Sequence, residues 1–148
     1  MEKTRHPVAS MSNLDVLTML FVLAEEVHGQ TLPVSVYHQA VAQLQDEIGD
    51  EVRELGVLQR FSRSKHTLTP YFPELEQIFA SQWAAGIHLF RLSMGGAREH
   101  ITIDPEWARR LLESYEEGSA FPERKMILEP LARRLAAIVQ EIAQQGDQ

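Results

Sequence analysis

The chain contains no cysteine among its 148 residues. A disulfide framework and thiolate metal sites are therefore excluded, and the composition fits a reducing compartment. No apolar run approaches the roughly 20 residues that a membrane-spanning helix needs. Residues 1–10 include Lys3, Arg5 and Pro7 but no apolar core, so we interpret them as a flexible lead-in and not as a secretory signal. These absences favour a cytoplasmic protein.

Positive charge and catalytic motifs are also scarce. The chain has 14 basic and 21 acidic residues, for a formal net charge of −7. Nucleic-acid affinity arises largely from the neutralisation of phosphates, so this balance disfavours a nonspecific nucleic-acid binder. The sequence contains no His-Glu-x-x-His, no Gly-x-Ser-x-Gly and no Gly-x-x-x-x-Gly-Lys phosphate loop. We therefore expect no catalytic residue, no bound metal and no cofactor.

Hydrophobic periodicity predicts several helices around one core. Hydrophobic residues make up 44% of the chain, and its length suits one folded domain. Apolar side chains recur at three- and four-residue steps, which is typical of helices that bury one face. Helices are expected from Ser12 to Gly29, from Ser35 to Gly49, over 73–85, from Asp104 to Glu117 and over 123–145, with a short helical piece at 50–58 and a break or kink near Pro130.

The stretch from Leu89 to Ile103 predicts a β-hairpin. Its apolar residues alternate with other side chains, as in a strand with one buried face. Gly95 and Gly96 lie between the two runs, and a type I′ turn needs two positive φ angles, which glycine adopts without strain. The residues expected to supply the packing of the hairpin are Leu89, Phe90, Leu92, Ile101 and Ile103. The hairpin fits either an ordinary cover of the core or a wing that contacts a partner.

A helix that leads directly into a hairpin, after earlier helices, is typical of a winged helix. The expected fold is mainly α-helical with one β-hairpin: a winged-helix-like domain over residues 11–118, followed by a C-terminal helical segment over 119–148. Winged helices include DNA-binding repressors and domains that bind only protein, so this fold does not decide the function.

For a DNA-binding role the sequence offers several candidate cations, but the helix in the position of a recognition helix is poorly suited to it. The candidate phosphate contacts are Arg60, Arg63 and Lys65 in the loop that follows residue 59, with Arg91 and Arg98 on the hairpin. The helix over 73–85 contains Glu74 and Glu76 but no lysine or arginine. Its side chains that suit base contacts are Gln77, Ser81 and Gln82. Carboxylates directed at phosphates repel them, so we expect weak, nonspecific DNA binding at most.

The last helix contains a heptad-like seam. The candidate partner-binding residues are Leu131, Leu135, Ile138 and Ile142, spaced by four, three and four residues. Such a seam fits a helix that closes its own domain, or a strip that joins a homodimer or a heterologous complex. A separate pair, Glu25 and His28, has Glu-x-x-His spacing, but di-metal carboxylate proteins use two such pairs. A solvated helix end explains it more simply.

The order helix, helix, loop, Tyr71-x-Pro73-Glu74-Leu75, helix ending Ala85-Gly86-Ile87 and hairpin resembles the Panacea-type family. The resemblance covers about Leu14 to Trp107. In that family an aromatic-proline-polar stretch leads into an acidic helix and a short wing, and some members resemble antitoxins that neutralise a toxin by direct binding. The resemblance implies a small, non-enzymatic, partner-binding domain, and it assigns no individual functional residue.

The residues and the resemblance together predict a small protein-binding regulator or assembly subunit, antitoxin-like if the resemblance holds. Its partner would be another protein or a second copy of the chain. A winged-helix transcriptional regulator that binds DNA is the alternative. A small enzyme or metal protein fits the residues least.

Overall fold

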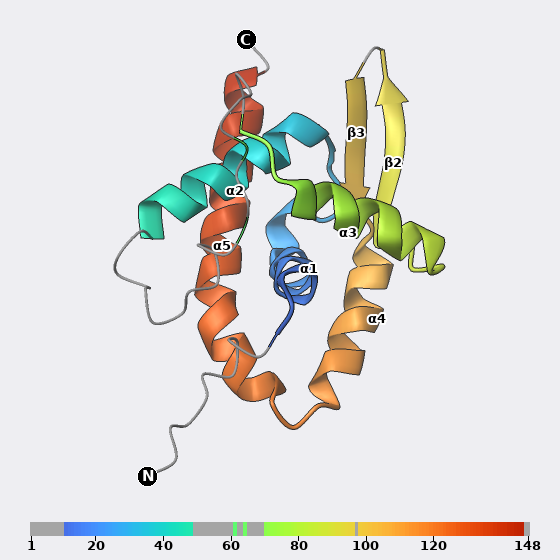
Figure 1. The fold of residues 1–148 in the computed structure, drawn as a ribbon, viewed down its shortest axis with the longest axis vertical. Helices are drawn as coiled ribbons and strands as arrows, with labels where there is room; N and C mark the ends of the chain where they lie inside the picture. The colour runs from blue at the N-terminus through green and yellow to red at the C-terminus, as the bar shows by residue number, and fades with distance from the viewer. Residues whose placement is uncertain (1–10, 49–60, 62–63, 65–69, 97, 147–148) are drawn as a thin grey trace.

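The computed structural model describes residues 11–48, 61, 64, 70–96 and 98–146 (Figure 1). Over these residues the chain is mainly helical, with a small antiparallel sheet of three strands. The helices are α1 (Asn13–Leu23), α2 (Val34–Ile48), α3 (Pro73–Ala84), α4 (Pro105–Glu116) and α5 (Phe121–Gly146), with a short 3-10 helix η1 (Glu25–Val27). The strands are β1 (Thr31–Pro33), β2 (Phe90–Gly95) and β3 (Arg98–Ile103). The predicted helical piece at 50–58 lies outside the described residues.

Helix α1 is the centre of the molecule, and Figure 1 shows it seen nearly end-on among the other helices. Every residue from Val16 to Leu23 is buried. The predicted single buried face is therefore wrong, because α3, α4 and α5 all pack against α1 and cover it from different sides. A helix that is apolar on all sides requires such an environment. Ser12 caps its start as predicted, because its hydroxyl accepts the Asp15 N–H at 3.1 Å.

Helix α1 also ends earlier than predicted. Ala24 leaves the helical region with φ −82° and ψ 63°, and η1 follows in place of a continuing α-helix. Gly29 adopts φ +82°, and its N–H donates to the carbonyl of Ile103 at 2.8 Å. This glycine therefore turns the chain into β1 instead of ending the helix.

The sheet has the strand order β1-β3-β2, so the predicted hairpin is only part of it. The additional strand β1 pairs antiparallel with β3, with Leu32 opposite Ile101. It has three residues, which is too short for an alternating pattern to appear in the sequence. The turn also lies one residue later than predicted. Gly95 is the last residue of β2 and pairs with Arg98, whereas Gly96 has φ +69°.

The helix boundaries predicted for α3 and α4 are confirmed to within a residue. Helix α4 begins with Pro105 after Asp104, whose carboxylate accepts the Trp107 N–H at 3.1 Å. Helix α2 begins at Val34, one residue before the predicted cap Ser35.

Helix α5 is continuous from Phe121 to Gly146, so the predicted break at Pro130 is wrong. Pro130 is exposed, and solvent can therefore hydrate the carbonyl that proline leaves without its helical donor. Helix α5 packs along α1 and α2, and its inner residues belong to the same hydrophobic core as those of α1 and α3.

Candidate functional site

The hairpin of β2 and β3 is buried at its base and exposed beyond it. Phe90 and Ile103 pair at the base and are 2% and 0% exposed. Leu92 and Met94, on the same face, are 48% and 65% exposed. The prediction that Leu92 packs in the core is therefore wrong, whereas its cross-strand partner Ile101, on the same face, is 0% exposed as predicted. The buried part of this face ends between Ile101 and Leu92, and both strands are exposed beyond that pair. Figure 1 shows both strands rising clear of α3. We call residues 91–96, 98 and 99 of this hairpin the wing.

Aromatic contacts and one carboxylate hold the base of the hairpin. The ring of Phe90 makes edge-to-face contacts with Phe21 and Phe79, with centroids 5.7 and 5.0 Å apart. Asp104, at the end of β3, also accepts from the guanidinium of Arg91 at 3.1 Å. The wing is therefore mounted on a packed, hydrogen-bonded support.

Strand β2 is an edge strand of the described sheet, with no strand paired on its outer side. The Asp104 N–H donates to the Leu89 carbonyl at 2.8 Å, so these two residues form a hydrogen-bonded pair of the ladder. Such pairs alternate along antiparallel strands. Arg91 and Ser93 therefore direct their backbone groups toward β3, whereas Leu92 and Met94 direct theirs outward. The exposed apolar residues of the wing are the same residues that present unpaired backbone groups.

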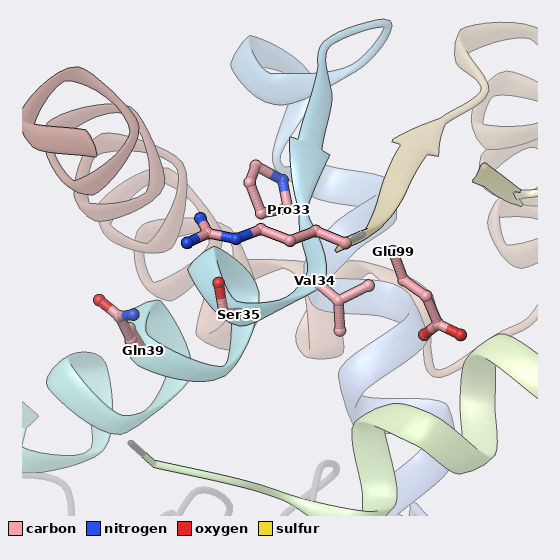
Figure 2. A pocket seen from close by; sticks show the side chains of 6 residues that line it. Pro33, Val34, Ser35, Gln39 and Glu99 are labelled. Carbon is pink, nitrogen blue, oxygen red and sulfur yellow. The ribbon is translucent and has the colours of Figure 1, made fainter. Parts of the chain in front are cut away.

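A groove runs along the other side of the wing, between β3 and the first turns of α2. Figure 2 shows Ser35 and Gln39 of α2 beside Val34, with Glu99 of β3 across from them. This groove has a volume of about 510 Å³ and is also lined by Arg98. An adjoining hollow of about 650 Å³ extends it to Ile142 near the end of α5. Taken together, the residues that line the groove and the adjoining hollow include cationic, anionic and amide side chains. None of these residues is a nucleophile hydrogen-bonded to a base.

The candidate nucleic-acid cations are not gathered into one described patch. Arg91 is paired with Asp104, and Arg98 is exposed near the tip of the wing. Arg60, Arg63 and Lys65 lie outside the described residues. In α3, the amide of Gln82 donates to the Thr18 hydroxyl at 2.6 Å, so this predicted base-reading residue is bonded to α1. Gln77 and Ser81 are exposed.

His38 is a buried polar residue that the sequence interpretation missed. Its Nδ1 accepts the Phe72 N–H at 3.0 Å, and its Nε2 donates to Glu76 at 3.1 Å, while its ring stacks on Tyr71. These bonds require the neutral Nε2–H tautomer. Burial lowers the pKa of His38, and the hydrogen bond and charge of Glu76 oppose that effect. The sequence signal for the burial of His38 was its position on α2, three residues before the core residue Val41, because residues three apart share a helix face.

The C-terminal strip lies inside the molecule. Leu131, Leu135 and Ile138 are 8%, 0% and 0% exposed, and Ile142 is partly buried against the same core. These residues therefore offer no exposed strip to a partner, because α1 and α2 of the same chain cover them. The alternative of a helix that closes its own domain accounts for the placement.

Polar residues beside the strip also find partners in the same chain. The guanidinium of Arg134 donates twice to the Glu47 carboxylate, at 2.7 and 2.6 Å, and this contact lowers the pKa of Glu47. Gln140 donates to the carbonyl of Glu26 at 3.2 Å. These bonds join α5 to α2 and η1.

Glu25 and His28 do not form the expected pair on one helix face. Glu25 begins η1 and is exposed, whereas the His28 Nε2–H donates to the Phe21 carbonyl at 2.8 Å near the end of α1. Within the described ranges there is no cluster of three or more His, Cys, Asp or Glu side chains suited to a metal ion. No helix that the structure describes is both long enough and apolar enough to cross a membrane.

Comparison with protein-family models, curated proteins and solved structures finds no match to this chain. The resemblance to the Panacea-type family therefore stays a prediction from the residues. Leu92 and Met94 of the wing are two of the large apolar residues that the described part of the chain exposes, and both lie on one face.

Proposed function

We propose that this chain is a small, non-enzymatic protein-binding regulator or assembly subunit, and that it contacts its partner through the wing. The observation that carries the proposal is the exposure of Leu92 and Met94 on one face of a projecting hairpin whose outer edge pairs with no strand among the described residues. Large apolar side chains that stay in solvent cost free energy, and contact with a partner recovers it.

The order of the elements supports a winged-helix type of domain. Helix α1, strand β1, helices α2 and α3, and then the hairpin follow one another, and α3 leads directly into β2. The choice between the protein-binding and the DNA-binding branch of this shape therefore depends on the chemistry of the surface.

The surface chemistry supports the same choice. Helix α3 has no lysine or arginine, Glu76 holds His38, and Gln82 is bonded to Thr18. A net charge of −7 adds repulsion toward phosphates. The wing instead offers apolar contact area beside single charged groups, as the core and rim of a protein interface do.

Affinity capture with chemical cross-linking tests the proposal when three forms of the tagged chain are compared. Wild type should retain a stoichiometric protein partner, and Leu92→Ser/Met94→Ser should lose it. Met126→Ser is the matched control, because Met126 is 79% exposed on α5, far along the chain from the wing. It should behave as wild type.

Two results would overturn the proposal. One is a partner retained equally by the double variant. The other is a tight complex with a defined duplex DNA at physiological salt, weakened by Arg98→Ala. In that case the transcriptional alternative would explain the wing, and Arg60, Arg63 and Lys65 would be the next cations to replace.

A further inference from the structure

We infer that the open edge of β2 pairs with β2 of a second copy of this chain, antiparallel, so that Leu92 of each copy lies opposite Met94 of the other. The inference rests on the proposed function, because it names the occupant of the wing. It joins two three-stranded sheets into one continuous sheet.

The backbone groups allow only half of the possible registers. Leu92 and Met94 present their N–H and C=O groups outward, whereas Arg91, Ser93 and Gly95 use theirs toward β3. Two edges bond only when an outward-facing residue lies opposite another one. Leu92 opposite Met94 satisfies this condition twice, once on each side of a twofold axis that passes between the two Ser93 residues.

The side chains select among the registers that remain. In the proposed register the two exposed apolar residues of one copy meet those of the other on the same face, since directly opposite residues of a strand pair share a face. Arg91 lies opposite Gly95, so its guanidinium keeps its bond to Asp104. If the twofold axis instead passed through residue 91, two residues nearer the base, Arg91 of one copy would lie opposite Arg91 of the other. That register is repulsive.

The charges of the strand also fit a self-complementary contact. Strand β2, with the sequence FRLSMG, contains no carboxylate, and its only charge is Arg91. Elsewhere the chain carries an excess of negative charge that opposes contact between copies. The edge of β2 is thus a stretch where two copies approach without opposing like charges. A single strand pair covers little area compared with a stable dimer interface of about 1,200–2,000 Å², so the dimer should dissociate on dilution.

The absence of cysteine makes a clean cross-linking test available. Ser93 is exposed and lies at the proposed twofold axis. The two Ser93 residues form a non-hydrogen-bonded pair, whose Cα atoms are about 4.5 Å apart in antiparallel sheets, within the range that a disulfide spans. Under mild oxidation, full-length Ser93→Cys should become a disulfide-linked dimer. Ser114→Cys, exposed on α4, is the control and should remain monomeric.

Sedimentation velocity of the cysteine-free chain over a hundredfold range of concentration gives the second measurement. Wild type should shift from monomer toward dimer as its concentration rises. Leu92→Ser/Met94→Ser and Met94→Pro should each weaken the association at least tenfold. Proline at Met94 removes an outward N–H that the β2–β3 ladder does not use, so its effect isolates the strand edge.

The outcomes separate this inference from the proposed function. A strict monomer at all concentrations, with no Ser93→Cys cross-link, overturns the inference. If the double variant then still loses a heterologous partner, the proposed function stands and the occupant is another protein. Efficient cross-linking through Leu92→Cys but not Ser93→Cys overturns the register, because Leu92 would then lie on the twofold axis.

Discussion

Two rows of apolar side chains, one on α5 and one on β2, differ in how far the rest of the chain covers them. The row on α5, Leu131, Leu135 and Ile138, looks like an interface seam and is buried within its own chain. The row on β2, Phe90, Leu92 and Met94, looks like the buried face of a hairpin and is exposed beyond its first residue. Periodicity identifies residues that share a face, but it carries no information about which element covers that face.

The difference follows from what lies opposite each row. Helix α5 packs against both α1 and α2, and Leu131, Leu135 and Ile138 of its row are buried there. Strand β2 meets α3 only near its base, where Phe90 contacts Phe79. Three changes to the chain should show whether each row contributes to stability as its surroundings require, and a change of pH should act on the helical body apart from both rows.

Removal of the α5 row should have the largest effect. A chain truncated after Glu129 loses Leu131, Leu135 and Ile138 from the core, and burial of each such side chain is worth about 1.5–3 kcal/mol. The exposed surfaces of α1 and α2 add to that cost, against a total stability of about 5–15 kcal/mol for an ordinary domain. The truncated chain should show no cooperative thermal transition by circular dichroism. A folded truncated chain would contradict the placement of α5 in the core.

Replacement of Phe90 at the base of the hairpin should come next. Phe90→Ala removes a buried ring that contacts Phe21 and Phe79, and it should lower the free energy of unfolding by about 3–5 kcal/mol. Urea denaturation measures this change. Leu92→Ala, two residues further along the same face, is the matched control and should cost less than about 1 kcal/mol. Equal costs at the two positions would mean that the boundary between base and wing is misplaced.

Acidification should lower the free energy of unfolding through His38 of α2, which belongs to neither apolar row. Burial gives His38 a lowered pKa in the folded state, so below the ordinary value of about 6.5 the unfolded chain binds a proton that the folded chain does not. Stability should therefore be complete above pH 7 and fall as the pH drops through 6.5, until the folded-state pKa is passed. Protonation of Nδ1 would also remove the acceptor of the Phe72 N–H.

Denaturation midpoints at pH 7.5, 6.5 and 5.5 measure this dependence, above the range where most carboxylates titrate. In His38→Gln the denaturation midpoint should change less with pH over that interval, although the variant itself is less stable than wild type. An unchanged slope in His38→Gln would assign the pH dependence to another group.

The smallest change in stability is expected from the wing. Leu92→Ser/Met94→Ser should lower the free energy of unfolding of the monomer by no more than about 1 kcal/mol, because Leu92 is about half exposed and Met94 mostly exposed. Thermal denaturation at a concentration low enough to exclude association measures it. A loss of several kcal/mol would show that the wing packs against the body, and the two rows would then be alike.

The boundaries of α3 and α4 were predictable because local signals mark them. Pro73 and Asp104-Pro105 favour helix starts whatever the rest of the chain does, and the alternation around Phe90 identifies a strand. Strand β1 was not predictable, since its three residues acquire their extended pairing from β3, about seventy residues later in the chain.

The candidate site was harder to predict from the sequence than the fold. Exposure of Leu92 and Met94 depends on how far the helical body reaches along the hairpin, which no local pattern encodes. The role of His38 depends on Phe72 and Glu76, which approach it only in the folded chain. Arg91 and Arg98 were correctly placed on the hairpin, but the pairing of Arg91 with Asp104 is a tertiary contact.

The packing of α5 against α1 has a consequence for synthesis of the chain. The eight consecutive buried residues of α1, Val16 to Leu23, leave the ribosome long before α5 exists, because about a hundred residues separate the two helices. At translation rates of about 5–20 residues per second, the most apolar segment of the chain waits several seconds for its cover. Helices α3 and α4 can cover two of its sides earlier, but the side that faces α5 stays exposed until the last helix is made. A chain that terminates before α5 should therefore expose part of α1 and be prone to aggregation.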